Sequence, residues 1–249
     1  MPIVLKGPEE IALMRQAGRA VAEVLGILRQ EIRPGLMLKR LDEVVRREFA
    51  KRKVVPTFLD YQGYPARVCV SVNDEIVHGI PNSRILQEGD IVSLDLGATH
   101  RGFVGDAAIT VAVGRISPEA ERLVRVTEEA LWEGIRAAKA GVRLGQISAA
   151  IQAHAEGNGF SVVREYVGHG VGRSMHEEPQ VPNFGLPDRG LLLQKGMTLA
   201  LEPMVTAGDW KTEKDPDGWT VRTADGSLAA HFEHTIAIIE GGAEVLTLP

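Results

Sequence analysis

The sequence has few of the features that mark disulfide-rich, membrane-spanning or nucleic-acid-binding proteins. Its single cysteine, Cys69, excludes an intrachain disulfide framework and any cysteine-rich zinc or iron–sulfur site, and it fits a reducing compartment. No apolar run approaches the roughly 20 residues that cross a bilayer, and residues 1–10 turn acidic where a signal peptide is apolar. No long basic run offsets the net charge of −5, which argues against dedicated binding of nucleic acid or anionic membranes. We therefore expect a cytoplasmic protein without a membrane or nucleic-acid partner.

Length and composition indicate a globular protein. The chain has 249 residues, of which 44% are hydrophobic, so it is long enough to bury a sizeable core. At about 150 residues per domain, this length is compatible with one large domain or two small ones.

Two stretches with helical periodicity begin the chain. After Gly7-Pro8, apolar or small residues recur at steps of three and four along one face, at Ile11, Met14, Gly18, Val21, Leu25 and Leu28. Pro34 ends this helix, because proline cannot continue the hydrogen-bond ladder. A second helix is expected around residues 41–49, and strand-like apolar runs follow at residues 68–72, 90–96 and 102–113.

The same order of elements then begins again. Ser117-Pro118 is a helix start, with serine as the N-cap and proline at the first helical position. Helices are expected from there to about residue 140 and over about 144–156. Strands are expected over residues 196–202 and 231–239.

Residues of the two halves correspond at a nearly constant offset. At an offset of 106, Gly35, Leu38, Leu41 and Val45 map onto Gly141, Leu144, Ile147 and Ile151. At an offset of 107, Gly89 and Asp95 map onto Gly196 and Glu202. This duplication predicts an α+β fold, with one domain over residues 1–249 that consists of two related halves of about 1–115 and 116–249.

Four acidic residues lie in apolar, strand-like surroundings. Asp95 and Asp106 lie on consecutive strands that we expect to be joined by a hairpin turn over residues 97–102, so that both carboxylates meet on one face. Glu202 and Glu233 occupy similar settings in the second half. For one such acid alone, a salt bridge is the simpler interpretation. No Lys or Arg is adjacent to any of the four, however, so the set predicts a multinuclear metal centre whose cations offset the repulsion.

One histidine stands among glycines, where the backbone passes close to a ligand or an ion. This is His169, in the segment Gly168–Gly172. The alternating glycines are superficially those of a dinucleotide-binding loop, but no helix-forming segment follows at the required spacing, and we reject that function. A lone histidine is more often a core residue, and the four carboxylates are what make His169 a candidate ligand.

Seven motifs resemble those of the short bacterial type I methionine aminopeptidases, a family with the pita-bread fold. They are Val77-His78-Gly79-Ile80-Pro81, Asp95-Leu96-Gly97, Gly105-Asp106, Gly168-His169-Gly170-Val171-Gly172, Met175-His176-Glu177-Glu178-Pro179, Leu201-Glu202-Pro203-Met204 and Phe232-Glu233-His234-Thr235. The resemblance covers nearly the whole chain. It implies two pseudo-symmetric halves with an antiparallel sheet covered by helices, in agreement with the offsets above.

The resemblance implies a site for two divalent metal ions. Asp95 would bind one ion, His169 and Glu202 would bind the other, and Asp106 with Glu233 would bridge the pair. Oxygen-rich ligation with one imidazole suits Mn²⁺, Fe²⁺ or Co²⁺, with Zn²⁺ as a further candidate. Two ions about 3.5–4 Å apart lower the pKa of a bridging water and clamp a tetrahedral intermediate.

The resemblance also implies three catalytic residues. His78 would hydrogen-bond the backbone of the scissile amide or of the residue after it, and His176 would donate to the scissile carbonyl and stabilise its oxyanion. Glu202, besides binding metal, would relay a proton from the attacking water to the leaving amine.

The remaining histidines are expected to have no direct part in the reaction. His231 shares the face of Glu233 by the period of a strand and is expected beside the site, whereas His234 points the other way. His100, in a turn, and His154, in a helix, match no position of the family.

The side chain of the substrate methionine is expected in an apolar and aromatic pocket, since such side chains suit a thioether. The residues that match this pocket are Phe58, Tyr61, Tyr64, Cys69, Met175 and Trp219. Phe58 stands where a cysteine is common in the family, and Met175 where an aromatic residue is common. Cys69 is expected to be a pocket wall and not a nucleophile, because no neighbouring base is evident.

The function that follows is metal-dependent removal of the initiator methionine from nascent proteins and peptides whose second residue is small. The substrates would be N-terminal methionine peptides and nascent chains, near the ribosome, and the enzyme a cytoplasmic monomer. One alternative is an inactive pita-bread module that binds peptides or proteins, although such relatives lose ligands. The other is a prolidase or aminopeptidase P-like peptidase, although those usually carry an extra N-terminal domain.

Overall fold

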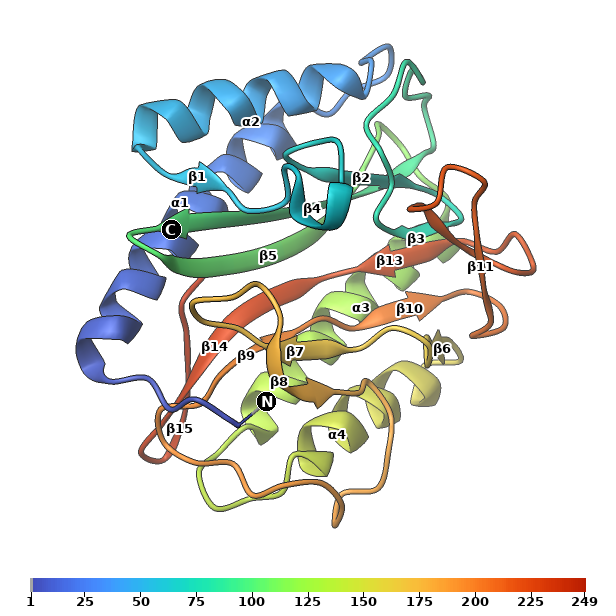
Figure 1. Ribbon diagram of the computed structural model, residues 1–249. Coiled ribbons are helices and arrows are strands. Elements are labelled where there is room, and N and C mark those ends of the chain that lie inside the picture. Colours follow the sequence, from blue (N-terminus) through green and yellow to red (C-terminus); the bar gives the residue numbers. More distant parts are fainter. Residues whose placement is uncertain (1) are drawn as a thin grey trace.

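Each half of the chain contributes a pair of helices and a set of antiparallel strands (Figure 1). The structure is a computed structural model, and it describes residues 2–249. The helices are α1 (Pro8–Glu31) and α2 (Lys39–Arg52) in the first half, and α3 (Pro118–Ala137) and α4 (Gly145–Gly157) in the second. All four lie where the sequence predicts them. The Ser117 hydroxyl caps α3 by accepting a hydrogen bond from the backbone N–H of Ala120.

The largest sheet of the described chain has nine strands, all paired antiparallel, and it runs through both halves. Its main path follows the order β1-β4-β5-β14-β9-β7-β8, while β2 pairs with β4 and β15 pairs with β14. The strands are β1 (Val55–Pro56), β2 (Cys69–Val72), β4 (Ile91–His100), β5 (Phe103–Ala112), β7 (Gly168–Gly170), β8 (Glu177–Val181), β9 (Thr198–Leu201), β14 (Glu233–Ile239) and β15 (Gly242–Val245). The halves join where β5 pairs with β14.

Two three-stranded sheets and a short 3₁₀ helix lie outside this path. One sheet has the order β13-β10-β6 and the other β11-β12-β3. The strands are β3 (Glu75–Val77), β6 (Ser161–Val162), β10 (Met204–Thr206), β11 (Thr212–Lys214), β12 (Val221–Thr223) and β13 (Ala229–His231), and the 3₁₀ helix η1 is Tyr61–Gly63. Most of these strands are too short to show a period in the sequence.

The offset between the halves recurs in the backbone contacts. The N–H of Gly35 donates to the carbonyl of Leu86 at 2.8 Å, and the N–H of Gly141 donates to that of Leu193 at 2.8 Å. Both glycines have a left-handed φ, of 86° and 85°. The chain therefore makes the same turn before α2 and α4, as two pseudo-symmetric halves require.

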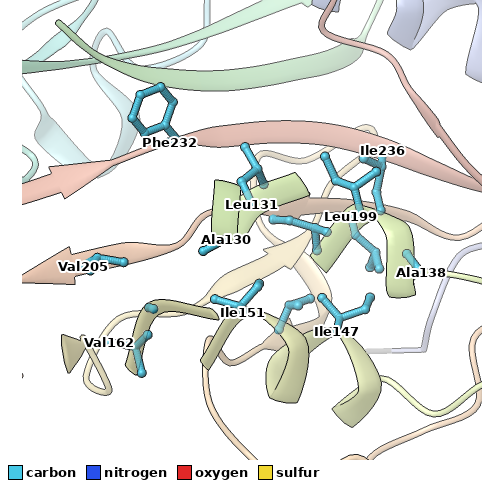
Figure 2. Close-up of a cluster of buried hydrophobic side chains, with 14 of the residues drawn as sticks. Ala130, Leu131, Ala138, Ile147, Ile151, Val162, Leu199, Val205, Phe232 and Ile236 are labelled. Atoms are coloured by element: carbon cyan, nitrogen blue, oxygen red, sulfur yellow. The ribbon is translucent and has the colours of Figure 1, made fainter. Parts of the chain in front are cut away.

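Each half has its own hydrophobic core. The first lies between α1, α2 and the strands β2 and β4, and contains Leu28, Leu41, Phe49 and Leu94. The second lies between α3, α4 and the strands β9 and β14. Figure 2 shows it, with Leu131, Ile147 and Ile151 of the helices pointing toward Leu199 and Ile236. Burial of these side chains, at about 25 cal/mol per Å², holds the helices on the sheet.

Glycine lets helix α1 approach the sheet closely. A Cβ at Gly105 of β5 would lie 2.4 Å from the backbone nitrogen of Gly18, and a Cβ at Gly18 would lie 2.3 Å from the carbonyl oxygen of Leu246. Neither position has room for a side chain. Gly18, which the helical pattern places on the apolar face, is therefore the point where the backbone of α1 packs directly against other backbone.

Two sequence predictions about strand boundaries are wrong. The hairpin after Asp95 is not a turn over residues 97–102, because β4 continues to His100 and the turn is Arg101-Gly102. His100 accordingly ends a strand. The expected strand over residues 231–239 is broken at Phe232, so that β13 and β14 belong to different sheets. A tertiary contact accounts for this break. The Thr110 hydroxyl accepts from the backbone N–H of His231 and donates to its carbonyl, so His231 is bound there by a side chain and not by a strand backbone.

The described part of the chain has no helix that is both long enough and apolar enough to span a membrane.

Candidate metal centre

One cavity of about 140 Å³ collects every site residue that the sequence predicts. Its lining contains the five predicted metal ligands, which are Asp95, Asp106, His169, Glu202 and Glu233. It contains the two predicted catalytic histidines, His78 and His176, and the six predicted pocket residues, which are Phe58, Tyr61, Tyr64, Cys69, Met175 and Trp219. Gln62 lines the cavity as well, and sequence reasoning missed it.

Strand register places one row of side chains across the sheet. Cys69 pairs with Asp95, Asp95 pairs with Ala108, and Ala108 pairs with Glu233. Residues that are directly opposite one another on paired strands project from the same face. The two carboxylates therefore face the same side, with only the methyl group of an alanine between them.

A second row runs beside the first. Asp106 pairs with Gly97, and His169 pairs with Ala200 of β9. Thr235 of β14 connects these two pairs. It pairs with Ala200, and its hydroxyl contacts the backbone N–H and carbonyl of Asp106 at 3.0 and 2.8 Å. Asp106 and His169 therefore point to the same face as Asp95 and Glu233.

Small residues in these rows leave space above the sheet. A Cβ at Gly97 would lie 2.7 Å from the ring of Phe58, so the glycine lets this ring pack directly on the strand. The sequence predicts that this glycine is part of a turn. In the structure, its missing side chain leaves room for the Phe58 ring, which lines the cavity.

The ring of His169 is arranged as a metal ligand. Its Nδ1 lies 2.8 Å from the carbonyl oxygen of Gly170 and donates to it, which leaves the lone pair on Nε2. Nε2 faces two carboxylates, at 3.5 Å from Glu202 and 3.8 Å from Asp106. Burial lowers the pKa of His169 to about 3, so the ring is neutral and able to bind a cation.

The four carboxyl groups lack the partners that buried acids normally have. Burial raises the pKa of Asp95 to about 7, and burial with mutual repulsion raises the pKa of the other three. One oxygen each of Asp95, Asp106 and Glu233 is buried without a hydrogen bond. Within residues 2–249, no Lys or Arg lies within 4.0 Å of any of the four. Divalent cations would remove both the repulsion and the missing contacts.

Donor spacing also fits a cation. One ligand atom each from Asp106, His169 and Glu233 lies within 4.8 Å of the other two, and all three residues are buried. Carboxylate oxygens with one imidazole nitrogen are the donors that Mn²⁺, Fe²⁺ and Co²⁺ accept. These residues therefore fit divalent metal ions.

His176 lies at the edge of this cluster. Its ring centroid is 4.3 Å from that of His169, and its Nδ1 is 2.8 Å from the hydroxyl oxygen of Tyr61. If the hydroxyl donates, the imidazole proton is on Nε2. Burial lowers the pKa of His176, which favours this neutral form.

His78 follows β3 with a left-handed φ of 61°, unusual for a residue with a side chain. Its ring packs edge-on against Tyr166 at 5.9 Å between centroids. Burial lowers the pKa of His78 to about 4, so this ring too is neutral.

Aromatic side chains form the apolar wall of the cavity. The rings of Tyr64 and Trp219 meet edge-on at 5.2 Å, and the Tyr64 hydroxyl lies 2.8 Å from the carbonyl oxygen of Gly79. Burial and the neighbouring Asp95 raise the pKa of the Cys69 thiol, so it stays protonated. This agrees with a wall residue and not with a thiolate nucleophile.

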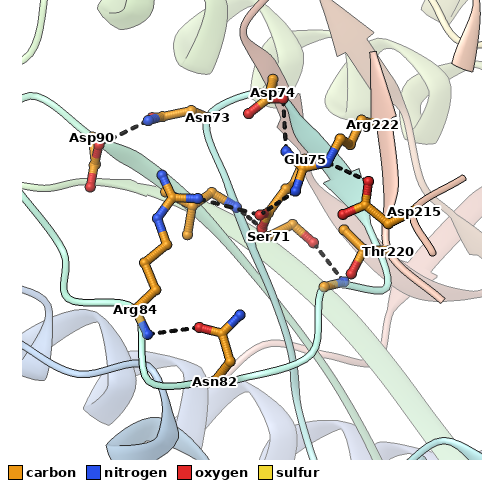
Figure 3. A network of polar contacts seen from close by, with 12 residues as sticks. Ser71, Asn73, Asp74, Glu75, Asn82, Arg84, Asp90, Asp215, Thr220 and Arg222 are labelled. Carbon is orange, nitrogen blue, oxygen red and sulfur yellow. Dashed lines mark hydrogen bonds and ion pairs between the residues drawn. The ribbon is translucent and has the colours of Figure 1, made fainter. Parts of the chain in front are cut away.

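A polar network outside the cavity fixes two segments of its border (Figure 3). The Arg222 guanidinium contacts Asp215 at 2.6 Å, Asp74 at 2.9 Å and Glu75 at 3.2 Å. Arg222 thereby ties the β11–β12 hairpin, whose turn contains Trp219, to β3, which leads to His78. Figure 3 shows Arg222 between these partners.

The other histidines lie outside the cavity lining. His231 is beside the site, with Nε2 4.0 Å from Glu202, but it reaches this place from another sheet and not by alternation along one strand with Glu233. His234 points away, as expected, and its Nδ1 lies 2.8 Å from the Thr247 hydroxyl. His154 contacts Glu129 on the helical surface at 3.0 Å.

Sequence reasoning assigned no role to three residues that line or support the site. They are Gln62 in the lining, Thr235 behind Asp106, and Asn183, whose amide donates to the Glu202 carbonyl at 3.0 Å. For Thr235, the only indication in the sequence is that a polar residue stands within a largely apolar strand. Gln62 lies in the three-residue helix η1 and Asn183 in an irregular segment, so no period in the sequence indicates the direction of either side chain.

The chain is similar to known proteins over nearly its whole length. Residues 12–240 match metallopeptidase family M24. A methionine aminopeptidase of Clostridium perfringens is 50% identical over 246 residues, which cover 99% of each chain. Methionine aminopeptidase 1 of Bacillus subtilis is 51% identical over 245 residues, 98% of this chain and 99% of that one.

Solved structures show the same fold. The crystal structure of a methionine aminopeptidase from Thermotoga maritima matches all of both chains with a TM-score of 0.98 at 51% identity. A prolidase from Pyrococcus furiosus has a TM-score of 0.81 at 21% identity and matches 99% of this chain but 66% of that one. At that identity the prolidase shows the fold alone.

Proposed function

The chain belongs to metallopeptidase family M24, and on this premise we propose how its residues remove an N-terminal methionine. The activity is that of a metallo-exopeptidase, since its relatives at about half identity over their full length are methionine aminopeptidases. The observation that carries the residue assignment is His169, whose free Nε2 faces two carboxylates that no Lys or Arg of the described chain neutralises.

The proposed ligand set would hold two divalent ions. Asp95 would hold one, His169 and Glu202 would hold the other, and Asp106 and Glu233 would be shared between them. Mn²⁺, Fe²⁺ and Co²⁺ suit these donors, and Zn²⁺ is also compatible with them. When bound, such ions neutralise the carboxylates, lower the pKa of the attacking water and stabilise negative charge on the carbonyl oxygen.

The protein side chains orient the substrate and move its protons. His176 donates from Nε2 to the scissile carbonyl oxygen, where negative charge develops as water attacks. His78 hydrogen-bonds the backbone of the scissile amide. Glu202 accepts a proton from the attacking water at a carboxylate oxygen and delivers it to the amine nitrogen as the peptide bond breaks.

The aromatic wall selects the first side chain. Phe58, Tyr61, Tyr64, Cys69, Met175 and Trp219 offer rings and soft sulfur to a thioether. We further propose that the residue after the methionine is small. An inactive binding module is disfavoured, because a chain without catalysis has no use for five metal-ligating side chains around one cavity.

Residues 1–249 form one catalytic domain in this proposal. One chain supplies all five proposed ligands and both proposed catalytic histidines, and we propose that the enzyme is a monomer. The substrates are N-terminal methionine peptides and nascent chains at the ribosome, which places the enzyme in the cytoplasm. The single free Cys69 agrees with that compartment.

Metal removal tests the proposal. Protein purified without added metal is analysed for its elements and assayed on Met-Ala-Ser and on a Met-Pro peptide. We expect chelation to abolish cleavage and Mn²⁺ or Co²⁺ to restore it. Cleavage that survives complete removal of metal would contradict the mechanism.

A further inference from the structure

His176 reaches the cavity on an irregular loop. β7 ends at Gly170 and β8 begins at Glu177, and the register between them shifts at the start of the loop. Residues 171–176 make no regular ladder, although the carbonyl of Gly172 accepts from the backbone N–H of Val104 at 2.8 Å. The position of His176 therefore depends on what holds the end of this loop.

Glu177 holds that end by accepting three hydrogen bonds. Two come from the loop itself, from the backbone N–H groups of Arg173 at 2.8 Å and Ser174 at 3.2 Å. The third comes from the ammonium group of Lys6, in an ion pair between residues 171 positions apart. One carboxylate thus joins the loop to the N-terminal segment.

Lys6 is buried together with its partner. Its side chain is only 3% exposed, and a lysine is almost never buried unless it is paired. Its Nζ also donates to the carbonyl of Val4 at 3.0 Å, and its backbone N–H donates to Gly196 at 2.7 Å. A buried ion pair of this kind fixes geometry more than it stabilises the fold.

The backbone of the loop at Gly172 packs directly against the aliphatic part of the Lys6 side chain. A Cβ at Gly172 would lie 2.4 Å from Cε of Lys6 and 2.6 Å from a carboxylate oxygen of Glu177. The stem and the loop backbone are therefore in direct contact. Displacing either one moves the other.

We propose that Lys6 is a positioning residue for the reaction, and we call its ion pair with Glu177 the clasp. The clasp holds residues 171–176 so that His176 stays beside His169 and within reach of the Tyr61 hydroxyl. Lys6 touches neither substrate nor metal, and it acts through Glu177. This inference rests on the proposed role of His176.

The variants K6M and E177Q test the clasp in the metal-loaded enzyme. K6M keeps most of the stem and removes the charge, and E177Q keeps the size and one acceptor oxygen. We expect kcat for Met-Ala-Ser to fall about 10-fold or more in both, because a displacement of about 1 Å is that costly to an oriented group. KM should change less than about 3-fold, and metal content should stay at the wild-type value, since the pocket and the ligands are untouched.

Hydrogen exchange gives a readout that does not depend on activity. Amides of residues 171–177 should exchange faster in K6M, while those of β9 and β14 should keep wild-type protection. The matched control is K195M, which removes an exposed lysine from its ion pair with Glu240 and should change neither kcat nor exchange. All assays use temperatures at which circular dichroism shows every variant folded.

The outcomes separate the clasp from the proposed function. Wild-type kcat per folded molecule in K6M, or unchanged exchange of residues 171–177, overturns the clasp, even if the melting temperature falls. A wild-type enzyme that does not cleave the peptide overturns the proposed function instead, and hydrogen exchange still decides whether Lys6 holds the loop.

Discussion

The hydroxyl oxygen of Tyr61 lies 2.8 Å from Nδ1 of His176, across 115 positions of sequence. Tyr61 belongs to η1 in the first half, and His176 belongs to the β7–β8 loop in the second. A donated Tyr61 proton leaves the imidazole proton on Nε2, the atom that would face the scissile carbonyl. Tyr61, expected from sequence only to line the methionine pocket, thus also contacts the histidine that we propose to be catalytic.

Tyr61→Phe is expected to lower kcat by about 2- to 10-fold, the equivalent of one neutral hydrogen bond. The ring stays in the pocket, so KM for Met-Ala-Ser should change less. Steady-state kinetics at equal metal content checks this. Tyr166→Phe is the control, because it removes the hydroxyl of another tyrosine, keeps the ring that packs against His78 and leaves the Tyr61 contact intact. An unchanged kcat in Tyr61→Phe would show that the contact has no catalytic role.

Glu233→Ala should lose at least one metal ion for each chain. Glu233 is only 2% exposed, and its carboxylate lies with Asp106 and His169 in one cluster, so no other side chain replaces it. Elemental analysis after desalting measures the ratio of metal to protein. Glu240→Ala, at an exposed position, is the control. Wild-type stoichiometry in Glu233→Ala would contradict a bridging role.

Two glycine substitutions within α1 should have opposite effects on stability. Gly18→Ala places a Cβ 2.3 Å from the Leu246 carbonyl oxygen and should destabilise the protein by about 1–3 kcal/mol. Gly26→Ala meets nothing within 4 Å and should stabilise it by about 0.5–1 kcal/mol, because alanine favours the helix. Urea denaturation measures both. Equal effects would mean that α1 does not pack as closely as the structure shows.

Glu48 should contribute a pH-dependent part of the stability. Hydrogen bonds from Lys51, Arg47 and Arg52 lower the pKa of Glu48 to about 2, from 4.5. A lowered folded-state pKa means that this stability is present above pH 4.5 and is lost as the pH falls toward 2. Since these bases are partly exposed, the contribution is about 1 kcal/mol.

Glu48→Gln tests this dependence through the difference in unfolding free energy from wild type, followed from pH 7 to pH 2.5. We expect the difference to be largest near neutral pH and to shrink below about pH 4.5. A difference that is constant with pH would assign the effect to packing.

The sequence determined the chemistry and the overall plan of this protein. Helices that bury one apolar face have a period of 3.6, so α1 to α4 were predictable to within a few residues. The Gly35 and Gly141 turns recur at one offset because both halves repeat the same left-handed conformation. Buried acids without neighbouring bases indicated a cation, since desolvation leaves few other solutions.

The tertiary structure decided which residues meet. Register across β2, β4, β5 and β14 aligns Cys69, Asp95 and Glu233 in one row, and register is a property of paired strands that no single strand encodes. The break at Phe232 places His231 and Glu233 in different sheets, because the Thr110 hydroxyl binds the backbone N–H and carbonyl of His231. Gln62 reaches the site from the three-residue helix η1, and Asn183 from an irregular segment. Lys6 contacts Glu177 only because folding brings an N-terminal segment under the loop of His176, a proximity that comes from packing and not from any local pattern.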